Sequence, residues 1–321
     1  MAQEIAPEVS GSDDARREEF RGELLAHCYR MLGSFEEAQD VVQETMLRAW
    51  RAADSYDPAR ASMRTWLYRI ATNACLTALA GRARRPLPSG LGPAGEDPQV
   101  PLVPRVDIPW LQPFPDHRLG DPADVAVQRA GLRLAFVAAL QLLPPRQRAT
   151  LVLCEVLRLT AADAADLLDT SVPSVTSSLQ RARATLRAAG PVLDELREST
   201  DPTERDVVDQ YVSAFEAADV PRLTKLLAAD VTLEMPPVNL WLRGRSHYGE
   251  FMDRVFGMRG PGWRLVPVAA NGSSALAAFA PDPDGGGVRR HSLQTFVVAD
   301  GRIRSSVSFV DPSLFGYFDL D

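Results

Sequence analysis

The chain has 321 residues, 45% of them hydrophobic, and is therefore long enough for two or three domains with packed cores. Its formal charge of −7 at pH 7 argues against a polycation that binds nucleic acid without specificity. The acidic N-terminus, the absence of a long apolar run and the dispersed cysteines lead us to expect a cytoplasmic protein without a membrane span, disulfides, metal or cofactor.

Helical periodicity dominates the first part of the chain. Residues 1–12 are expected to be disordered, and residues 13–85 to form a helical domain. In the helix expected at 36–53, a buried stripe is predicted by apolar spacing at Ala38, Val41, Val42, Thr45, Met46 and Ala49. The opposite face carries Asp40, Gln43, Glu44, Leu47 and Arg51. We interpret it as a docking face for a large protein, and an ordinary solvated surface is the alternative.

The next helix, SMRTWLYRIATNACLTALAGRARR at 62–85, is expected to bury Met63, Leu67, Ile70, Ala71 and Ala74. Its outer side is expected to carry Arg64, Tyr68, Arg69, Thr72, Asn73 and Thr77, followed by Arg82, Arg84 and Arg85. Such a face suits unpaired bases, because rings and guanidinium planes stack on them and an amide can pair with their edges. The alternative is that Trp66 and Tyr68 are core aromatics.

Residues 86–123 are predicted to be an extended linker rather than part of a core, because the segment 86–122 contains ten prolines and few apolar runs. Helices are expected to resume over residues 124–197. There, a short helix at Thr160–Leu168, a turn at Asp169–Ser171 and a longer helix from about Val172 predict a helix-turn-helix. Hydroxyls at Thr160 and Ser171 can cap the two helices, and the second helix of such a motif usually enters the major groove of DNA.

The arginine distribution supports contact with nucleic acid. Six arginines and no acid lie between Pro58 and Gly95, and three arginines and no acid lie between Thr170 and Leu193. Two basic segments in an acidic chain indicate two phosphate-facing surfaces. A solvated arginine face is the alternative, since Lys225 is the single lysine of the chain.

Past residue 200 the pattern changes to that of a separate α+β domain at 203–321. We expect helices at about 203–217, 220–228 and 245–256, a strand near 231–235, and alternating strands to residue 310. Turns are predicted at Gly285–Gly287 and Asp300–Gly301. The expected fold is thus multidomain, with two all-α domains followed by an α+β domain.

Three motifs now point to a family. AQDVVQETMLRAW (38–50), TWLYRIATN (65–73) and LPPRQRATLVL (143–153) with SVPSVTSSLQRARATL (171–186) resemble bacterial sigma factors of the extracytoplasmic-function type, in the sigma-70 family. The resemblance covers about residues 16–190. It implies a protein that directs core RNA polymerase to promoters and opens the DNA, without bond chemistry of its own.

The resemblance also implies roles for named residues. The clamp of the polymerase β′ subunit would be contacted by Asp40, Gln43, Glu44 and Leu47, and the β flap would be a further contact. The minus-ten element, double- and then single-stranded, would be bound by Arg64, Tyr68, Arg69, Asn73, Arg82, Arg84 and Arg85. The minus-thirty-five element would be read by Ser174, Thr176, Ser177, Ser178, Arg181 and Arg183. Many relatives have arginine at the positions of Thr176 and Ser178, so a different promoter preference is expected.

The linker is long enough for this task. About 37 residues at roughly 3.1 Å each reach on the order of 110 Å, whereas promoter elements two helical turns apart need about 70 Å. By the resemblance, this segment would thread the polymerase near the RNA exit path, with Trp110 and Phe114 docking there or anchoring the loop.

The tail resembles a SnoaL-like domain of the NTF2-like superfamily, on the segments 206–237 and WLRGRSHYGEFM (241–252). The resemblance implies a curved sheet with helices around a conical pocket, and regulation of the sigma core by contact within the chain. Pocket-lining candidates are Trp241, His247 and Tyr248, with Glu234 and His291 as further ones. Their spacing pairs no carboxylate base with an oxyanion donor, so no catalytic residue is predicted. Two alternatives stay open: a helix-turn-helix regulator with a ligand-sensing tail, and a cyclase- or isomerase-like enzyme.

Overall fold

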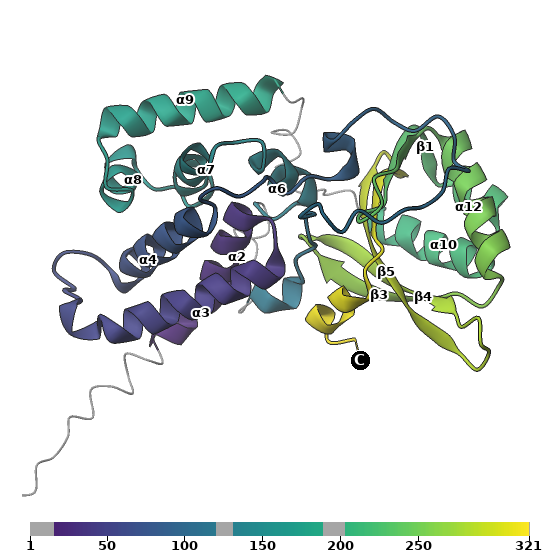
Figure 1. Ribbon diagram of the computed structural model, residues 1–321, viewed down its shortest axis with the longest axis horizontal. Helices are drawn as coiled ribbons and strands as arrows, with labels where there is room; N and C mark the ends of the chain where they lie inside the picture. The colour runs from purple at the N-terminus through teal and green to yellow at the C-terminus, as the bar shows by residue number, and fades with distance from the viewer. Residues whose placement is uncertain (1–15, 120–130, 189–202, 321) are drawn as a thin grey trace, which may run out of the picture. The chain divides into compact units, whose positions relative to one another are not determined.

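The computed structural model describes residues 16–119, 131–188 and 203–320, and the chain divides into two compact units (Figure 1). The first unit comprises residues 1–83, 117–132 and 139–193, and the second comprises residues 84–116, 133–138 and 194–321. The disorder expected at 1–12 and the start of the helix expected at 124 lie outside the described residues. The all-α and α+β parts of the predicted fold class are both confirmed.

The first unit begins with three packed helices, α2 (Arg21–Leu32), α3 (Phe35–Arg51) and α4 (Met63–Ala78), with a 3-10 turn at Ala53–Ser55. Gly33 ends α2 in a left-handed conformation, with φ of 70°, which glycine adopts without a steric cost. Ser34 then caps α3, because its hydroxyl accepts the backbone N–H of Glu37. Ser62 caps α4 in the same way, through the N–H of Thr65.

The helix-turn-helix has the predicted local structure. After α6 (Leu134–Leu140), α7 (Pro145–Leu151) continues into a π-helical turn (Val152–Val156) and is followed by α8 (Ala161–Leu167) and α9 (Val172–Ala188). Thr160 and Asp163 form a reciprocal capping box at the start of α8. Asp169 takes a positive φ of 52° in the turn. Ala164 and Ala165 are buried, as expected where two helices pack closely.

A buried arginine ties this motif to the first helices of the same unit. Arg148 in α7 donates to the carbonyl oxygen of Met31 in α2, and also to Gln141 Oε1, at 2.7 Å, and to the carbonyl of Leu143, at 3.2 Å. Burial lowers the pKa of Arg148 to about 10, so the side chain remains a cation at neutral pH. Its acceptors satisfy a charge that would otherwise be costly to bury.

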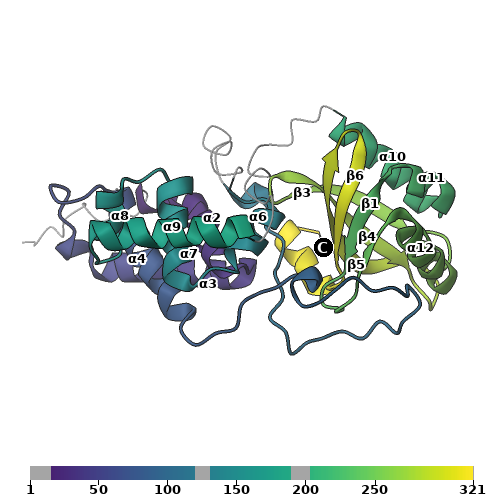
Figure 2. The same ribbon diagram turned by 90° about the horizontal axis from the view of Figure 1, so that it is seen from above.

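The second unit is a sheet covered by helices (Figure 2). It contains α10 (Glu204–Glu216), α11 (Val220–Lys225), β1 (Leu227–Glu234), β2 (Trp241–Arg243), α12 (Arg245–Arg259), β3 (Arg264–Ala270), β4 (Ser273–Pro281), β5 (Val288–Ala299), β6 (Arg302–Phe309) and a 3-10 helix, η6 (Pro312–Phe318). The strand order is β2-β1-β6-β5-β4-β3, with β1 and β6 parallel and the other neighbours antiparallel. The predicted turns join β4 to β5 and β5 to β6, whereas β2 and η6 were not predicted.

The proline-rich segment belongs to this second unit, as residues 84–116. Leu111 and Phe114 are fully buried. The expectation that this segment lies outside any core is therefore wrong for these residues. The sequence reading failed because the apolar residues are isolated between prolines and find their partners more than a hundred residues away.

Candidate functional site

The outward face of α3 is exposed, as predicted. Asp40 and Gln43 are solvent-exposed, and Leu47 keeps 40% of its surface. Glu44 is half-buried and accepts a hydrogen bond from Arg48 Nε at 2.7 Å. Trp50, three residues after Leu47, is 58% exposed and extends the apolar part of this face. Sequence reasoning missed Trp50, although its i, i+3 spacing from Leu47 was a usable signal.

The predicted outer face of α4 needs correction. Arg69 and Asn73 are exposed, but Tyr68 is only 3% exposed and Thr72 is fully buried. The Tyr68 hydroxyl donates to Glu23 Oε2 at 3.1 Å. Tyr68 is thus a core aromatic and is not available to stack on a base in this structure. The reason is that α2 packs on this side of α4.

A buried histidine holds the same helix contact. His27 Nε2 lies 2.9 Å from Thr72 Oγ1, and the His27 ring meets the Tyr68 ring edge-on at 5.0 Å. Burial lowers the pKa of His27 to about 3, with Arg30 and Arg64 nearby adding to the effect. Arg64 itself forms an ion pair with Glu23, at 2.8 Å, and covers the Tyr68 ring.

The arginines predicted for the minus-ten element lie in different surroundings. Arg69 donates to the carbonyl oxygen of Asp166 in α8, within the first unit. Arg82 pairs with Glu37 in α3. Arg84 and Arg85 lie in the second unit, where they donate to the carbonyls of Gly90, at 3.0 Å, and Trp110, at 3.1 Å. These four arginines are divided between the two units and therefore do not form one continuous basic tail.

The second helix of the helix-turn-helix presents a polar face. The predicted residues Ser174, Ser177, Ser178 and Arg181 follow i, i+3, i+4, i+7 spacing and share one side of α9. Arg181 Nη1 donates to Ser177 Oγ at 2.5 Å, whereas Thr176 is exposed on a different side of α9. Arg183 differs, because it pairs with Glu155 of the π-helical turn and so stabilises the motif.

The proline-rich segment is bound along the C-terminal domain. Its first contact is the backbone N–H of Ser89, which donates to Glu234 Oε2 at 2.8 Å. Its last contacts join Phe114 to Asn271 by two hydrogen bonds of 2.9 Å, one to the side-chain amide oxygen and one between backbones. Asp116 then accepts the N–H of Gly272. Residues 89–116 are therefore anchored at both ends.

Trp241 and Arg254 hold the middle of this segment. Trp241 Nε1 donates to the carbonyl of Gly92 at 2.9 Å, and the N–H of Gly95 donates to the carbonyl of Trp241 at 2.8 Å. A Cβ on Gly95 would come within 2.6 Å of Leu240 Cδ1, so a larger residue here would force the Leu240 side chain to shift. Arg254 Nη1 in α12 donates to the carbonyls of Pro98, at 2.8 Å, and Val100, at 2.7 Å.

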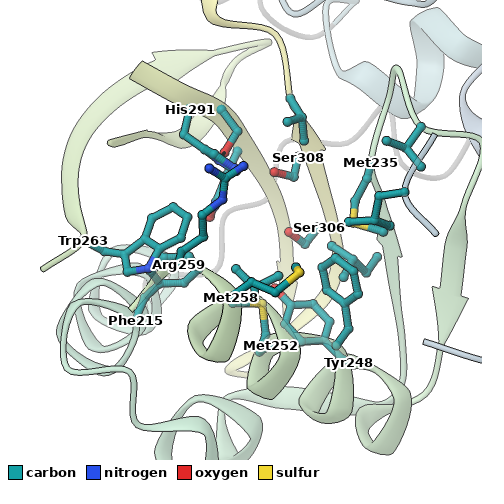
Figure 3. A pocket seen from close by; sticks show the side chains of 18 of the residues that line it. Phe215, Met235, Tyr248, Met252, Met258, Arg259, Trp263, His291, Ser306 and Ser308 are labelled. Carbon is teal, nitrogen blue, oxygen red and sulfur yellow. Dashed lines mark hydrogen bonds between the residues drawn. The ribbon is translucent and has the colours of Figure 1, made fainter. Parts of the chain in front are cut away.

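A cavity of about 240 Å³ lies inside the C-terminal domain (Figure 3). Aromatic, methionine and aliphatic side chains from α10, α12 and the sheet make most of its wall, and Leu102 and Pro104 of the proline-rich segment complete it. Of the predicted lining residues, Tyr248 and His291 are in the wall. The predictions for Trp241, His247 and Glu234 are wrong. Trp241 and Glu234 bind the segment 89–95, and His247 is on the surface with Nδ1 2.9 Å from the carbonyl of Arg243.

The polar groups of the cavity form a small network. The Tyr211 hydroxyl lies 3.1 Å from that of Tyr248 and donates to Gln294 Oε1 at 3.2 Å. Burial raises the pKa of both tyrosines, so both hydroxyls keep their protons. Burial also lowers the pKa of His291 to about 4, with Arg259 and Arg289 contributing, so the imidazole is neutral at pH 7.

We searched the residues that the structure describes for metal sites and for membrane-spanning helices. Across residues 16–119, 131–188 and 203–320, no cluster of three or more histidine, cysteine or carboxylate side chains could hold a metal ion. Within the same ranges, no helix has both the length and the hydropathy to cross a membrane.

Comparison with known proteins connects this architecture to a class of transcription proteins. Residues 17–85 match the family model of sigma-70 region 2, residues 133–186 that of sigma-70 region 4, and residues 208–306 that of the SnoaL-like domain. The chain thus combines two sigma-70 regions with a SnoaL-like domain.

Two curated relatives align with nearly the whole chain. The ECF RNA polymerase sigma factor SigG of Mycobacterium tuberculosis is 44% identical over 99% of this chain and 86% of its own. SigJ of the same organism is 26% identical over 93% of this chain and 91% of its own. The crystal structure of Mycobacterium tuberculosis SigJ shares the fold, with a TM-score of 0.65 and 24% identity over 98% of this chain and 100% of that one. The chain belongs to the extracytoplasmic-function RNA polymerase sigma factors, which bind core RNA polymerase and promoter DNA.

Proposed function

We propose that this sigma factor is restrained by its own C-terminal domain, which holds the segment between the two sigma regions. The observation that supports this proposal is the binding of residues 89–116 along the domain, from the Ser89–Glu234 contact to the Phe114–Asn271 contact. On a promoter, sigma regions 2 and 4 sit on elements about 70 Å apart, at roughly 35 Å per helical turn. A segment anchored at both ends along a folded domain is not free to extend between these elements.

Contacts between the two sigma regions, within the first unit, also support restraint of the factor. Arg69, which we assign to the minus-ten element, donates to the carbonyl of Asp166 in the helix-turn-helix. Arg148 bridges the helix-turn-helix to α2. Binding to two separated promoter elements requires both contacts to break. Release of the linker segment is therefore the step that would permit the two sigma regions to separate.

For contact with polymerase, we assign the exposed face of α3 that contains Asp40, Gln43, Glu44 and Leu47, extended by Trp50. An apolar centre surrounded by acid and amide groups is typical of a protein interface core with a polar rim. The clamp of β′ is the proposed partner of this face, and the flap of β that of region 4. The factor would act in the cytoplasm, where it meets core polymerase.

For DNA contact, we assign Asn73, Arg69 and Arg64 of α4 to the minus-ten element, with Arg82 adding a phosphate contact. On α9, Ser174, Thr176, Ser177, Ser178 and Arg181 would read the minus-thirty-five element. Arg64, Arg69, Arg82 and Arg181 have protein partners in the free chain, and each would exchange them for DNA. Arg183 and Tyr68 are assigned to structure instead.

We further propose that the C-terminal domain works by binding rather than by catalysis. SnoaL-like domains include enzymes, and those enzymes need a carboxylate base that faces the substrate. No carboxylate lines the cavity among the residues that the structure describes. Glu234, the carboxylate expected from the sequence to line the pocket, is instead buried and accepts the N–H of Ser89.

The polymerase assignment is tested by a charge reversal on α3. We expect Glu44→Arg to weaken binding to core polymerase in a quantitative pull-down while helix content stays unchanged by circular dichroism. Glu19→Arg is the matched control, because it makes the same charge change at an exposed position outside α3. Equal binding by wild type and Glu44→Arg would remove the assignment of this face.

A further inference from the structure

We propose that the C-terminal cavity binds a small aromatic monocarboxylate, and that the bound molecule tightens the grip of the domain on the segment 89–116. This inference deepens the proposed restraint and rests on it. It is carried by the composition of the cavity wall, by one charged side chain and one unpartnered donor in that wall, and by the two linker residues that complete it.

The size and lining of the cavity select an apolar body. An apolar cavity of about 150 Å³ holds benzene, so the volume of about 240 Å³ here suits a molecule of two rings. The wall includes Tyr248, Phe251, Met252 and Trp263, which offer ring faces and polarizable sulfur to an aromatic body. Figure 3 shows Met252, Met258 and Tyr248 gathered on one side of the cavity and His291 and Arg259 on another.

The charged end of the molecule is selected by Arg259. Among the described lining residues Arg259 is the one that is charged at neutral pH, because His291 is neutral there. Arg259 is exposed, and no carboxylate within the described part of the chain lies within ion-pair distance of it. A guanidinium at the opening of an apolar cavity binds a carboxylate through charge-assisted hydrogen bonds. A cation at the same place would be repelled.

A second donor in the wall lacks a partner. The indole Nε1 of Trp263 is buried and makes no hydrogen bond within the structure, although the residue is only 4% exposed. A buried donor left unsatisfied is destabilising. The Trp263 ring packs against His291 at 5.0 Å, on the side of the cavity where Arg259 also lies. An acceptor oxygen on a bound molecule would satisfy this N–H.

The linker segment makes binding and restraint interdependent. Leu102 and Pro104 are part of the wall, and Pro104 forms a bridge with Val238, another lining residue. Arg254 holds the carbonyls of Pro98 and Val100 just before them. A molecule that touches both the domain and these two residues has more contacts when the segment is bound. By thermodynamic linkage it must favour the bound segment, and the bound segment must favour the molecule.

The test measures binding of 2-naphthoate and of its neutral amide, 2-naphthamide, to the full chain by isothermal titration calorimetry. We expect the acid to bind about tenfold more tightly than the amide, from one charged hydrogen bond at the partly exposed opening. Arg259→Ala should abolish this preference, and Arg222→Ala, an exposed arginine of α11 with no part in the wall, should leave it unchanged. No binding, or equal binding of acid and amide, would overturn the carboxylate proposal.

The coupling is tested on the same samples by hydrogen exchange. Saturating 2-naphthoate should slow exchange of the Gly95 and Arg105 amides, which donate to the carbonyls of Trp241 and Pro237. Leu102→Gly should weaken binding of the acid without affecting the folding of the sheet. Binding of the acid with unchanged exchange at these amides would overturn the coupling. The restraint itself is measured by transcription without any added compound, so its failure is distinguishable from a failure here.

Discussion

Arg254→Ala should loosen the linker segment from the C-terminal domain. Arg254 Nη1 donates to two carbonyls, those of Pro98 at 2.8 Å and Val100 at 2.7 Å. A hydrogen bond to a charged group contributes about 1.5–3 kcal/mol when it is shielded from water. Because this side chain is only half-buried, water competes for both bonds. We therefore estimate a loss of about 2 kcal/mol for the pair together.

This loss corresponds to a shift of roughly 30-fold in the equilibrium between bound and released segment. The assay is native-state hydrogen exchange of the Gly95 and Arg105 amides, which flank the carbonyls that Arg254 holds. Exchange at both amides should accelerate by up to that factor. Amides of the interior strands β4 and β5 should exchange at the wild-type rate, since the hydrogen bonds of Arg254 go to Pro98 and Val100.

Arg222→Ala provides the control, because it removes an exposed arginine of α11 in the same domain. If exchange at Gly95 and Arg105 is the same in Arg254→Ala as in wild type and control, the segment is not held by this side chain. The argument that linker carbonyls are the points of attachment would then be refuted.

Three further predictions concern stability. The pKa of His27 is lowered from 6.5 to about 3, so the unfolded chain binds a proton that the folded chain does not. The free energy of unfolding should therefore fall by about 1.4 kcal/mol per pH unit from pH 6.5 toward pH 3. This effect is measured as a steeper loss of stability with acid in wild type than in His27→Gln. Thr160→Ala removes the α8 capping box and should cost about 1 kcal/mol in denaturant unfolding, while an unchanged midpoint would contradict the role of the cap. Burial raises the pKa of Glu234 above 4.5, so ionisation of this carboxyl opposes folding increasingly as pH rises past 4.5. Glu234→Gln should therefore melt no lower than wild type at pH 7. A lower melting temperature of the variant would show that the contact with Ser89 needs the negative charge.

Features fixed by neighbours in the sequence could be predicted. The α8 cap at Thr160 and the turn at Asp169 depend on residues within one helical turn, and the structure has both where they were expected. The exposed residues of α3 follow from the spacing of its buried stripe. The β5–β6 turn follows from the Asp300–Gly301 pair, because aspartate and glycine tolerate the positive φ that both adopt there.

Features fixed by distant partners could not be predicted. Tyr68 is turned inward by Glu23, a residue 45 positions earlier, so the periodicity of α4 alone could not show whether it was exposed. Trp241 was expected in the cavity wall, but its indole N–H binds the backbone at Gly92, 149 positions away. A helical or strand pattern reports which face is apolar and does not report which element covers it.

The proline-rich segment was likewise predicted to be a linker because its contacts are made with distant residues. Proline has no N–H to donate, so such a segment cannot add a regular strand to a sheet and reads as a linker. Its carbonyls still accept hydrogen bonds. Arg254 donates to the carbonyls of Pro98 and Val100. The Trp241 indole donates to the carbonyl of Gly92. Isolated apolar residues such as Phe114 were the available signal that this segment packs on a domain.

The central claim is that the C-terminal domain restrains the sigma factor by holding its linker. The most direct measurement is transcription by core RNA polymerase reconstituted with the full chain on a genomic promoter library. Wild type is compared with the double variant Trp241→Phe, Arg254→Ala, which removes the side-chain donors to the linker, and with Arg222→Ala. The account predicts more transcript from the double variant than from the other two proteins. Equal or lower transcript from the double variant, once hydrogen exchange has shown its segment to be released, would contradict the account.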